Sequence, residues 1–403
     1  MVALTLWAAR VGGTLAPEVW EFVKSEDAEL LPYDCAGTRL HARRLHAAGL
    51  LDDAELADVD ARLDQIGPDD LEPTDEDVHT AIERLLGPVG RKIHAGRSRN
   101  DQVATAHRLY IQDACDEAGA SLRTFAAALL DRADAEAATP MPAYTHLQRA
   151  IPVTLGHHLL AWIEMLERDA ARFAFVHGQA ELLPLGAGAV AGSTLPLPPP
   201  EAPMRNTIDA VADRDFVLDY LYACALLFVH LSRIAEEICL WATTEFGFAK
   251  LPEDAATGSS MMPQKLNPDV AELTRGKAGT AIGRLTGLLA TVKGLPLAYN
   301  SDLAEDKQAT FRARRDVRLA LGALTVLVEG LELDRERLAA AAADPLLRAT
   351  DAAEELVERG MPFRDAHAEI ASRVRAGTFE PPPARPRGLD VEGAVSAARE
   401  RWS

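Results

Sequence analysis

Three short polar segments interrupt a chain that is otherwise rich in apolar residues, and each contains side chains able to bind a ligand or move a proton. They read HAGRSRNDQ from His94, YTHLQ from Tyr144 and GSSMMPQKLNPD from Gly258. The third segment places Lys265 and Asn267 a few residues after a Gly-Ser-Ser sequence. Backbone N–H groups, hydroxyls, a cation and an amide in one loop suit a ligand that carries a carboxylate.

Each segment also has a plain structural interpretation. Ser98 and Asn100 are residue types that cap helices, and Asn100 or Asp101 could cap the helix predicted to follow. His146 could be a buried histidine with its hydrogen bonds satisfied, and the third segment could be a solvated loop. For any one segment taken alone, the structural interpretation is favoured, so the chemical interpretation depends on all three together.

The composition favours an all-α fold. Only 5% of the 403 residues are aromatic, and stretches rich in Ala, Leu and Glu are broken mainly by Pro and Gly. The length allows one large core or two to three domains. The 61 acidic and 42 basic residues give a net charge of -19, which excludes a nucleic-acid binder because phosphate binding needs a positive surface.

The apolar periodicity predicts a series of helices and three domains. Helices are expected over 39–66 and 74–87, from about 101 to 180 with a break at Pro140, Pro142 and Pro152, over 208–246, through about 293, and over 307–330. Residues 183–203 read as a Gly- and Pro-rich crossover loop, and PPPARPRG at 381–388 as an extended connector. The predicted domains are 1–96, 97–337 and 338–403. The helix over 208–246 is apolar nearly all round, which indicates burial in an oligomer.

The remaining composition indicates a cytoplasmic protein without a membrane segment. The four cysteines are widely spaced, with no C-x-x-C pair, so neither a zinc site nor a disulfide scaffold is indicated. No targeting sequence is evident at the N-terminus, and the most hydrophobic stretch, from Val217 to Trp241, carries five ionisable residues. Since no nucleotide-binding motif is present either, we expect an enzyme without a cofactor, if the chain is an enzyme.

Taken together, the three segments resemble the signatures of the fumarase and argininosuccinate lyase superfamily. GSSMMPQKLNPD is similar to its glycine-serine-serine loop followed by M-P-x-K-x-N. Further segments resemble argininosuccinate lyase in that family's order, namely HAGRSRNDQVAT, YTHLQRAIPVTLGHHLLAW, LPLGAGAVAGST, DAVADRDFVLDYL, NPDVAELTRGK, YNSDLAEDK and LVERGMPFRDAH. Gln264, together with S-R-N-D-Q, points to argininosuccinate lyase rather than fumarase or adenylosuccinate lyase.

The resemblance implies a fold, an assembly and a reaction. The fold would be three mostly helical domains around a central bundle, associated as a homotetramer with active sites built from three subunits and no cofactor or metal. The reaction would be β-elimination of argininosuccinate to arginine and fumarate, a step of arginine biosynthesis. His79 and Glu83, four residues apart on a predicted helix, could pair on a metal, but the family has a similar segment near its site and uses no metal.

The resemblance also assigns roles to individual residues. Catalytic roles fall to Ser259, His146, Lys265 and Glu272, and substrate binding to Ser98, Arg99, Asn100, Thr145, Asn267, Tyr299 and Lys307. Ser259 would be the general base, with Lys265 stabilising its alkoxide, because the elimination passes through a carbanion-like dianion that cations must hold. His146, hydrogen-bonded to Glu272, would protonate the departing nitrogen or orient the group that does, and Lys307 would bind the amino-acid end.

Several positions depart from the family pattern. Family members usually begin with W-G-G-R-F, whereas Trp7–Val11 reads WAARV here. The stretch Phe22–Asp27 is shorter than in the family, and its Ser25 is shifted. Ala304 replaces a glutamine of the family, and Leu266 replaces a lysine. These changes fall where the arginine half of the substrate would bind. Two alternatives therefore stay open: a fumarate-releasing lyase for a different N-substituted aspartate, and a catalytically silent structural relative.

Overall fold

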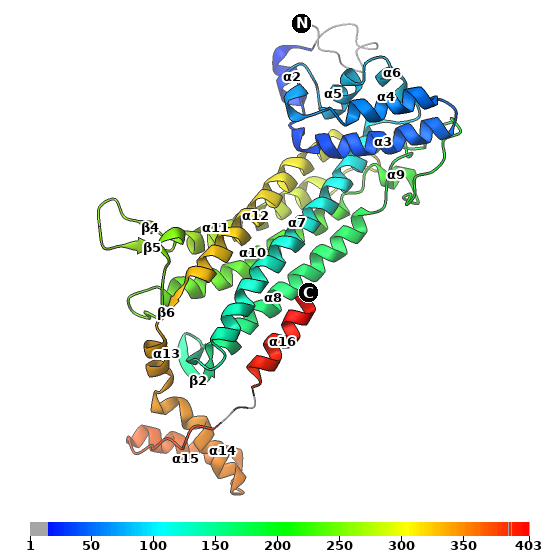
Figure 1. Ribbon diagram of the computed structural model, residues 1–403. Helices are drawn as coiled ribbons and strands as arrows, with labels where there is room; N and C mark the ends of the chain where they lie inside the picture. The colour runs from blue at the N-terminus through cyan, green and yellow to red at the C-terminus, as the bar shows by residue number, and fades with distance from the viewer. Residues whose placement is uncertain (1–14, 386, 388, 403) are drawn as a thin grey trace. The chain divides into compact units, whose positions relative to one another are not determined.

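The computed structural model describes residues 15–385, 387 and 389–402; the altered Trp7–Val11 stretch lies outside them. The described chain is mostly helical, with three sheets of two antiparallel strands each, β1–β2, β3–β6 and β4–β5 (Figure 1). The all-α prediction is therefore confirmed. The chain divides into two compact units. One comprises Met1–Gly119, Ala170–Leu226 and Gly279–Arg318, and the other comprises Ala120–Asp169, Leu227–Ala278 and Leu319–Ser403.

Five long helices contribute a segment to each unit. They are α7 (Arg99–Ala135), α8 (Leu155–Ala180), α10 (Asp215–Trp241), α11 (Asp269–Val292) and α12 (Asp306–Gly330). The helix predicted over 208–246 is instead α9 (Thr207–Ala210) followed by α10. The break arises because Asn206 caps α9, whereas the Asp213 carboxylate accepts a hydrogen bond from the Asp215 N–H and starts a new helix. The predicted boundaries of the three domains stay a prediction.

The first unit begins with short helices that pack on one another. They are α2 (Pro17–Val23), η1 (Ala28–Leu30), α3 (Leu31–Ala47), α4 (Asp53–Leu63), η2 (Pro68–Asp70), α5 (Val78–Leu85) and α6 (Gly90–Ile93). Figure 1 shows α3 to α6 gathered together, and α3 contacts α4, α5 and α6. The helix predicted over 39–66 is two helices because Gly49 has a φ of 73° and Asp52 with Glu55 forms a capping box that begins α4.

Helix α10 is long and apolar enough, by length and composition alone, to span a membrane. However, 61% of its most apolar window is buried inside the folded chain. The core helix of a water-soluble protein passes the same test of length and hydropathy, so the pattern is explained by burial in the bundle.

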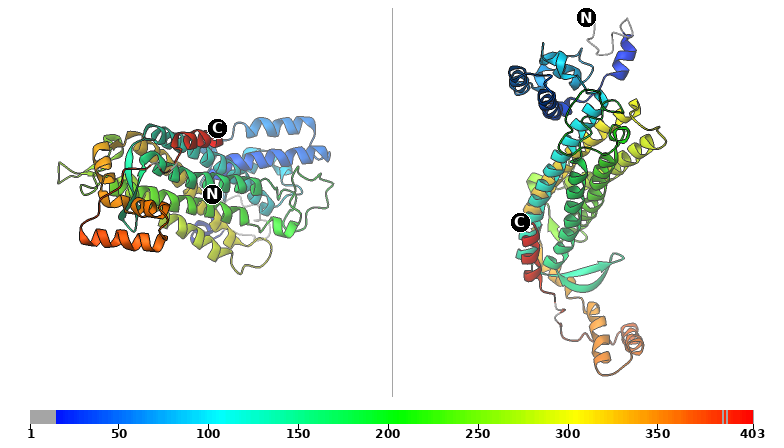
Figure 2. Two further views of the ribbon diagram at one scale, coloured as in Figure 1. Left: turned by 90° about the horizontal axis from the view of Figure 1, so that it is seen from below. Right: turned by 90° about the vertical axis from the view of Figure 1, so that its right-hand side faces the viewer.

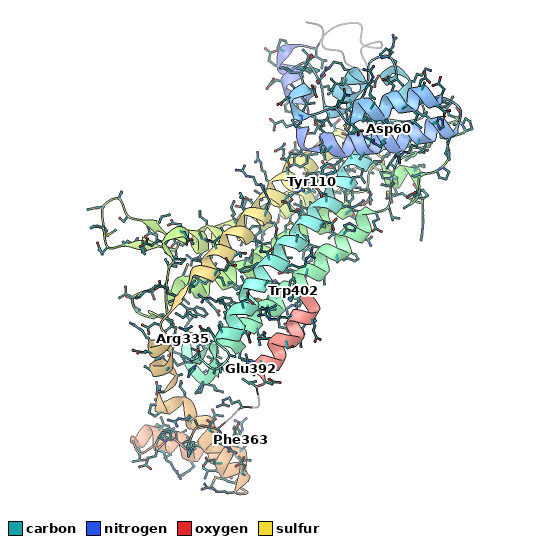
Figure 3. The ribbon with its side chains drawn as sticks, viewed as in Figure 1. Asp60, Tyr110, Arg335, Phe363, Glu392 and Trp402 are labelled. Atoms are coloured by element: carbon teal, nitrogen blue, oxygen red, sulfur yellow. The ribbon has the colours of Figure 1, made fainter. Side chains whose placement is uncertain are left out.

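The second unit carries two hairpins and the C-terminal helices. Its other elements are β1 (Pro140–Thr145), β2 (Gln148–Thr154), β3 (Ala249–Lys250), η3 (Glu253–Ala255), β4 (Thr257–Gly258), β5 (Leu266–Asn267), β6 (Glu332–Leu333), α13 (Arg335–Ala342), η5 (Pro345–Arg348), α14 (Ala349–Glu358), α15 (Phe363–Ala376) and α16 (Val391–Trp402). The β1–β2 hairpin is seen clearly in the right-hand view of Figure 2. Figure 3 labels Arg335 at the start of α13. This arginine forms an ion pair with the fully buried Glu136.

The last helix, α16, returns to pack within the second unit. Figure 3 labels Glu392 near its start and Trp402 at its end. Val391, Val395 and Ala398 are buried. Gly156 on α8 is closely packed, because an added Cβ there would meet the Ala133 carbonyl oxygen and, at 3.0 Å, the Val391 side chain. The described residues of the connector before α16, 381–385 and 387, lie outside any helix or strand, and its extended conformation stays a prediction.

A buried histidine in the first unit makes the stability of the fold depend on pH. Burial first, and then the charge of Arg97, lower the pKa of His41 from 6.5 to about 3. Its Nε2 lies 2.9 Å from the Ala95 carbonyl oxygen. Below pH 6.5 the unfolded chain therefore binds a proton at this residue that the folded chain does not bind until the pH approaches 3. Stability is lost as pH falls through that window.

We expect this residue to contribute a slope of about 1.4 kcal/mol per pH unit to the free energy of unfolding between roughly pH 6 and pH 4. His41→Gln keeps a donor for the Ala95 carbonyl but removes the titration. Urea unfolding of both proteins at a series of pH values measures the difference. Wild-type and variant curves that run parallel across this window would contradict the assignment.

Candidate active site

In the first unit, a cleft brings together four of the predicted substrate-binding residues. Arg99 and Asn100 come from the start of α7, Tyr299 from the loop after α11, and Lys307 from the first turn of α12. The same cleft is lined by Ala304, on η4 (Ser301–Glu305). Residues from distant parts of the sequence thus face one cleft, as the resemblance requires.

Capping at the start of α7 sets the positions of these residues. Ser98 is the residue before the helix, and its hydroxyl accepts a hydrogen bond from the Asn100 N–H at 3.3 Å, while Asp101 accepts from the Ser98 N–H at 2.9 Å. The cap is therefore Ser98, and the prediction of Asn100 or Asp101 as cap is wrong. The second oxygen of Asp101 accepts hydrogen bonds from Gly186 and Gly188, each at 2.9 Å, which holds the crossover loop against the helix.

Arg99 is fixed by carboxylates of its own unit. Its guanidinium forms an ion pair with Asp77, lies 3.7 Å from Glu76 and donates to the Thr80 hydroxyl at 2.7 Å. Asp77 in turn caps α5 by accepting a hydrogen bond from the Thr80 N–H at 2.8 Å. The orientation of Arg99 is thus determined before any ligand binds.

Lys307 is buried, and its ammonium lies 3.4 Å from Asp306. Asp306 also accepts a hydrogen bond from Arg214 and lies 3.3 Å from Nδ1 of His107. Burial alone would raise the pKa of Asp306, but the charges of Lys307, His107 and Arg214 hold that pKa well below its usual value. The carboxylate is therefore ionised and lies beside the Lys307 ammonium at the cleft.

The cleft also contains residues that sequence reasoning did not assign to the site. Asp27, Ser25 and His79 line it. The shortened N-terminal stretch is anchored there, because Ser25 N–H donates to the Glu76 carbonyl at 3.0 Å. Although this stretch is shorter than in the family pattern, Ser25 still lies at the cleft. For Ser25 the resemblance was the available signal, because it placed the stretch 22–27 near the substrate. Asp27 was not singled out, because its position at the cleft depends on the fold of the loop.

His79 does not pair with Glu83 on a metal. Its Nδ1 lies 2.9 Å from the Asp34 carboxylate, which comes from α3, and Glu83 instead lies 3.8 Å from His94. Among the described residues no group of three or more metal-binding side chains is present. The i, i+4 spacing of His79 and Glu83 on α5 suggested a pair, but the carboxylate that faces His79 belongs to Asp34 on α3.

In the second unit, Thr145 and His146 stand at the tip of the β1–β2 hairpin. Thr145 pairs with Gln148, so His146 and Leu147 form a two-residue turn, and both have positive φ, 55° and 57°. Such values are typical of the tight hairpin turn in which Asn and Gly are preferred. Both side chains of the turn are exposed. A histidine and a leucine are therefore held in a backbone conformation that costs them energy.

Ser259, Lys265 and Asn267 lie on the hairpin formed by β4, β5 and the loop that joins them. The Ser259 hydroxyl accepts hydrogen bonds from the N–H groups of Met261 at 3.3 Å and Met262 at 3.0 Å. These two residues therefore supply backbone donors to the serine oxygen, and their side chains are exposed. Lys265 is exposed as well.

Glu272 lies in the first turn of α11 and is exposed. Its carboxylate is 3.7 Å from Arg275. The predicted hydrogen bond between His146 and Glu272 is not among the hydrogen bonds formed within the described part of this chain. The roles assigned to both residues stay predictions.

Comparison with known proteins decides the family. A family model described as "Lyase" matches residues 24–283, and one described as "Argininosuccinate lyase C-terminal" matches residues 346–380. Argininosuccinate lyase of Frankia casuarinae is 49% identical over 391 residues, 92% of this chain and 84% of that protein, and the enzyme of a Synechococcus species is 46% identical over 395 residues, 93% and 81%. The chain belongs to the argininosuccinate lyase family.

Solved structures support the same assignment. EDDS lyase in complex with formate aligns with a TM-score of 0.77 and 25% identity over 97% of this chain and 90% of that chain. A 3-carboxy-cis,cis-muconate lactonizing enzyme from Pseudomonas putida, at 21% identity and a TM-score of 0.74, shares the fold over 96% of this chain and 98% of its own. As a member of the argininosuccinate lyase family, the chain is an enzyme, a carbon–nitrogen lyase, and the resemblance drawn from the three segments is confirmed.

Proposed function

We propose that the chain cleaves argininosuccinate to arginine and fumarate, as a cytoplasmic homotetramer in arginine biosynthesis, with no cofactor and no nucleic-acid or membrane partner. The observation that best supports the proposal is that the predicted site residues fall into two groups, one at a cleft and one on loops. Substrate-binding side chains line a cleft in the first unit, whereas Ser259, His146 and Lys265 stand on projecting loops of the second.

The chemistry needs a base, cations and a proton donor. Ser259 removes the proton from the carbon next to a carboxylate, and the N–H groups of Met261 and Met262 stabilise its alkoxide, since hydrogen bonds to the charged form favour that form. Lys265 and Asn267 bind the succinyl carboxylate as its negative charge grows. Lys307, which forms an ion pair with Asp306, binds the carboxylate at the amino-acid end.

The exposure of the catalytic residues supports a site shared among subunits. A general base works best where water is excluded, because electrostatic stabilisation is weak in bulk solvent. Thr145, His146, Lys265 and Glu272 are all exposed in the single chain. Insertion of both loops at the cleft of another subunit would bury them and bring Glu272 within reach of His146. Among exposed apolar side chains, Met261 and Leu147 at the loop tips suit such an insertion.

Mixing of two inactive variants tests the shared site. We expect Ser259→Ala and His146→Gln each to have little activity, and a mixture in which subunits have exchanged to recover part of the wild-type activity, because some sites then contain only intact residues. The rate of fumarate formation, followed by its absorbance, is the measurement. Subunit exchange is verified by mass spectrometry with one variant isotopically labelled, and exchange without recovery would count against shared sites.

Because of Ala304, we expect the enzyme to bind the arginine half of its substrate more weakly. It lines the cleft together with Lys307, where the family has a glutamine, so one hydrogen bond to the substrate is missing. The loss of one such bond weakens binding by about 1 kcal/mol if water replaces it. We therefore expect Ala304→Gln to lower KM for argininosuccinate about fivefold with little change in kcat. An unchanged KM would show that no group of the substrate reaches this position.

A direct assay separates the alternatives. Wild-type protein is given argininosuccinate and a panel of other N-substituted aspartates, and fumarate is measured by its ultraviolet absorbance. Fumarate release from argininosuccinate with the highest kcat/KM of the panel supports the proposal. Release only from another adduct would move the assignment to a lyase for that adduct, and release from none would favour a silent structural relative.

A further inference from the structure

His79 is a buried titratable group at the cleft to which the mechanism above gives no task. The residue is 4% exposed and lines the cleft together with Asn100 and Lys307. Neither ring nitrogen forms a hydrogen bond with a described residue, but Nδ1 lies 2.9 Å from the Asp34 carboxylate, whereas no carboxylate lies at that distance from Nε2 among the ion pairs of the described chain. Buried polar atoms in native proteins are nearly always hydrogen-bonded, so an unpaired ring nitrogen at a ligand cleft is a group reserved for the ligand.

A carboxylate holds the ring in a fixed orientation. Asp34 faces Nδ1 of His79 at 2.9 Å and is itself fixed by the Gln102 side-chain amide, which lies 3.0 and 2.9 Å from its two oxygens. Because the Asp34 carboxylate faces Nδ1 as its ion-pair partner, Nε2 is the ring nitrogen left for a ligand. An Asp–His pair of this kind is the usual arrangement for a histidine that gives or takes a proton at its second nitrogen.

The surroundings of the ring keep it protonated. Burial would lower the pKa of His79, but the carboxylates of Asp34, Asp77 and Asp27 outweigh burial and hold the pKa above its usual value. The positive groups nearby are Lys307 and Arg99, which lie at the same cleft, and Arg97, whose charge acts on Asp34. His94 has a pKa lowered to about 4 and is therefore neutral at physiological pH. The raised pKa thus favours the protonated ring, in which Nε2 carries a proton.

We propose that His79 is the general acid of the elimination and donates its Nε2 proton to the departing nitrogen. The inference rests on the proposed function. It gives His146 the other role left open for it, that of orienting groups at the reacting end, which suits a side chain at the tip of an exposed hairpin. His79 is within the cleft that contains the residues for the amino-acid half of the substrate, where the leaving nitrogen must lie.

Each bond and proton of the step is accounted for. The Ser259 alkoxide takes the proton from the carbon next to the carboxylate, and the electron pair of that C–H bond forms the new double bond. The C–N bond breaks with its electron pair going to the guanidino nitrogen, which receives the proton from Nε2 of His79. Fumarate and arginine with a charged guanidinium leave. Solvent then returns the proton from Ser259 to His79, so the enzyme is restored without another reactant.

A substrate whose leaving group needs no proton tests the role. 2-Chlorosuccinate gives the same fumarate by the same C–H removal, but chloride departs as a stable anion. We expect His79→Gln to lower kcat for argininosuccinate by at least about a hundredfold, and to lower kcat for 2-chlorosuccinate far less. Ser259→Ala is the control that must lose both activities, because proton removal is common to both substrates.

The remaining outcomes are each decisive. Equal losses of kcat on both substrates in His79→Gln, or a selective loss in His146→Gln instead, would overturn the inference. If His79→Gln does not fold, as judged by its thermal unfolding, Asp34→Asn leaves the imidazole in place without its carboxylate, and the same selective loss is expected. Wild-type protein that releases fumarate from 2-chlorosuccinate but not from argininosuccinate would defeat the proposed function itself, which is a different result from either.

Discussion

Replacement of Ser259 by alanine is expected to lower kcat for argininosuccinate by two or more orders of magnitude, about the amount that a general base contributes. The residue is on an exposed loop and its hydroxyl bonds only to the N–H groups of its own turn, at Met261 and Met262. Its removal therefore creates no cavity in the core and leaves no buried group unpaired. Steady-state kinetics give kcat, and calorimetric titration gives the affinity for substrate, which we expect to stay close to that of the wild type.

The neighbouring serine provides a matched control for this prediction. Ser260 has the same side chain on the same loop, but it is exposed and its hydroxyl forms none of the hydrogen bonds found in the described chain. Ser260→Ala is therefore expected to lose much less activity than Ser259→Ala. Near-normal turnover in Ser259→Ala, or an equal loss in the two variants, would remove Ser259 from the mechanism as the specific base.

The elements that the sequence identified correctly are those with a long, regular pattern. Helices α7, α8, α11 and α12 follow the predicted ranges within a few residues, because each repeats apolar positions at helical spacing over several turns. The errors lie at helix ends, where a single glycine or capping residue determines where a helix stops or starts. The split between α3 and α4 depends on Gly49 with its positive φ, and the start of α7 depends on which of Ser98, Asn100 and Asp101 serves as cap.

Site residues that belong to a sequence motif could be predicted from the sequence. Site residues whose role depends on a contact formed only in the folded chain could not. Four substrate-binding residues named from the sequence line one cleft, namely Arg99, Asn100, Tyr299 and Lys307. The pairing of His79 with Asp34 was missed, because residues on two different helices meet only after folding, and no periodicity connects them. Likewise, the donors that Met261 and Met262 give to Ser259 are backbone groups, so the residue types at those positions do not reveal them.

The largest effect on stability is expected from Asp306. This carboxylate is fully buried and compensates the charges of two groups of its own unit: Arg214 donates a hydrogen bond to it, and Lys307 lies 3.4 Å away. His107 lies 3.3 Å away as well, but burial lowers its pKa. Asp306→Asn keeps the volume but leaves the buried Arg214 and Lys307 without a compensating charge. Breaking a buried pair in this way costs about 3–5 kcal/mol. We therefore expect the free energy of unfolding by urea to fall by that amount.

The same substitution at an exposed ion pair isolates burial as the cause. Asp131 pairs with Arg399 at 2.7 Å, but its side chain is 71% exposed, and such surface pairs contribute between zero and about 1 kcal/mol. Both variants are unfolded at one protein concentration, because the stability of an oligomer depends on concentration. Equal destabilisation by Asp131→Asn and Asp306→Asn would show that the buried cluster around Asp306 stabilises the fold no more than an exposed ion pair does. A large loss in Asp306→Asn alone, accompanied by a raised KM, would tie the stability of the cluster to the position of Lys307, since one carboxylate supports both.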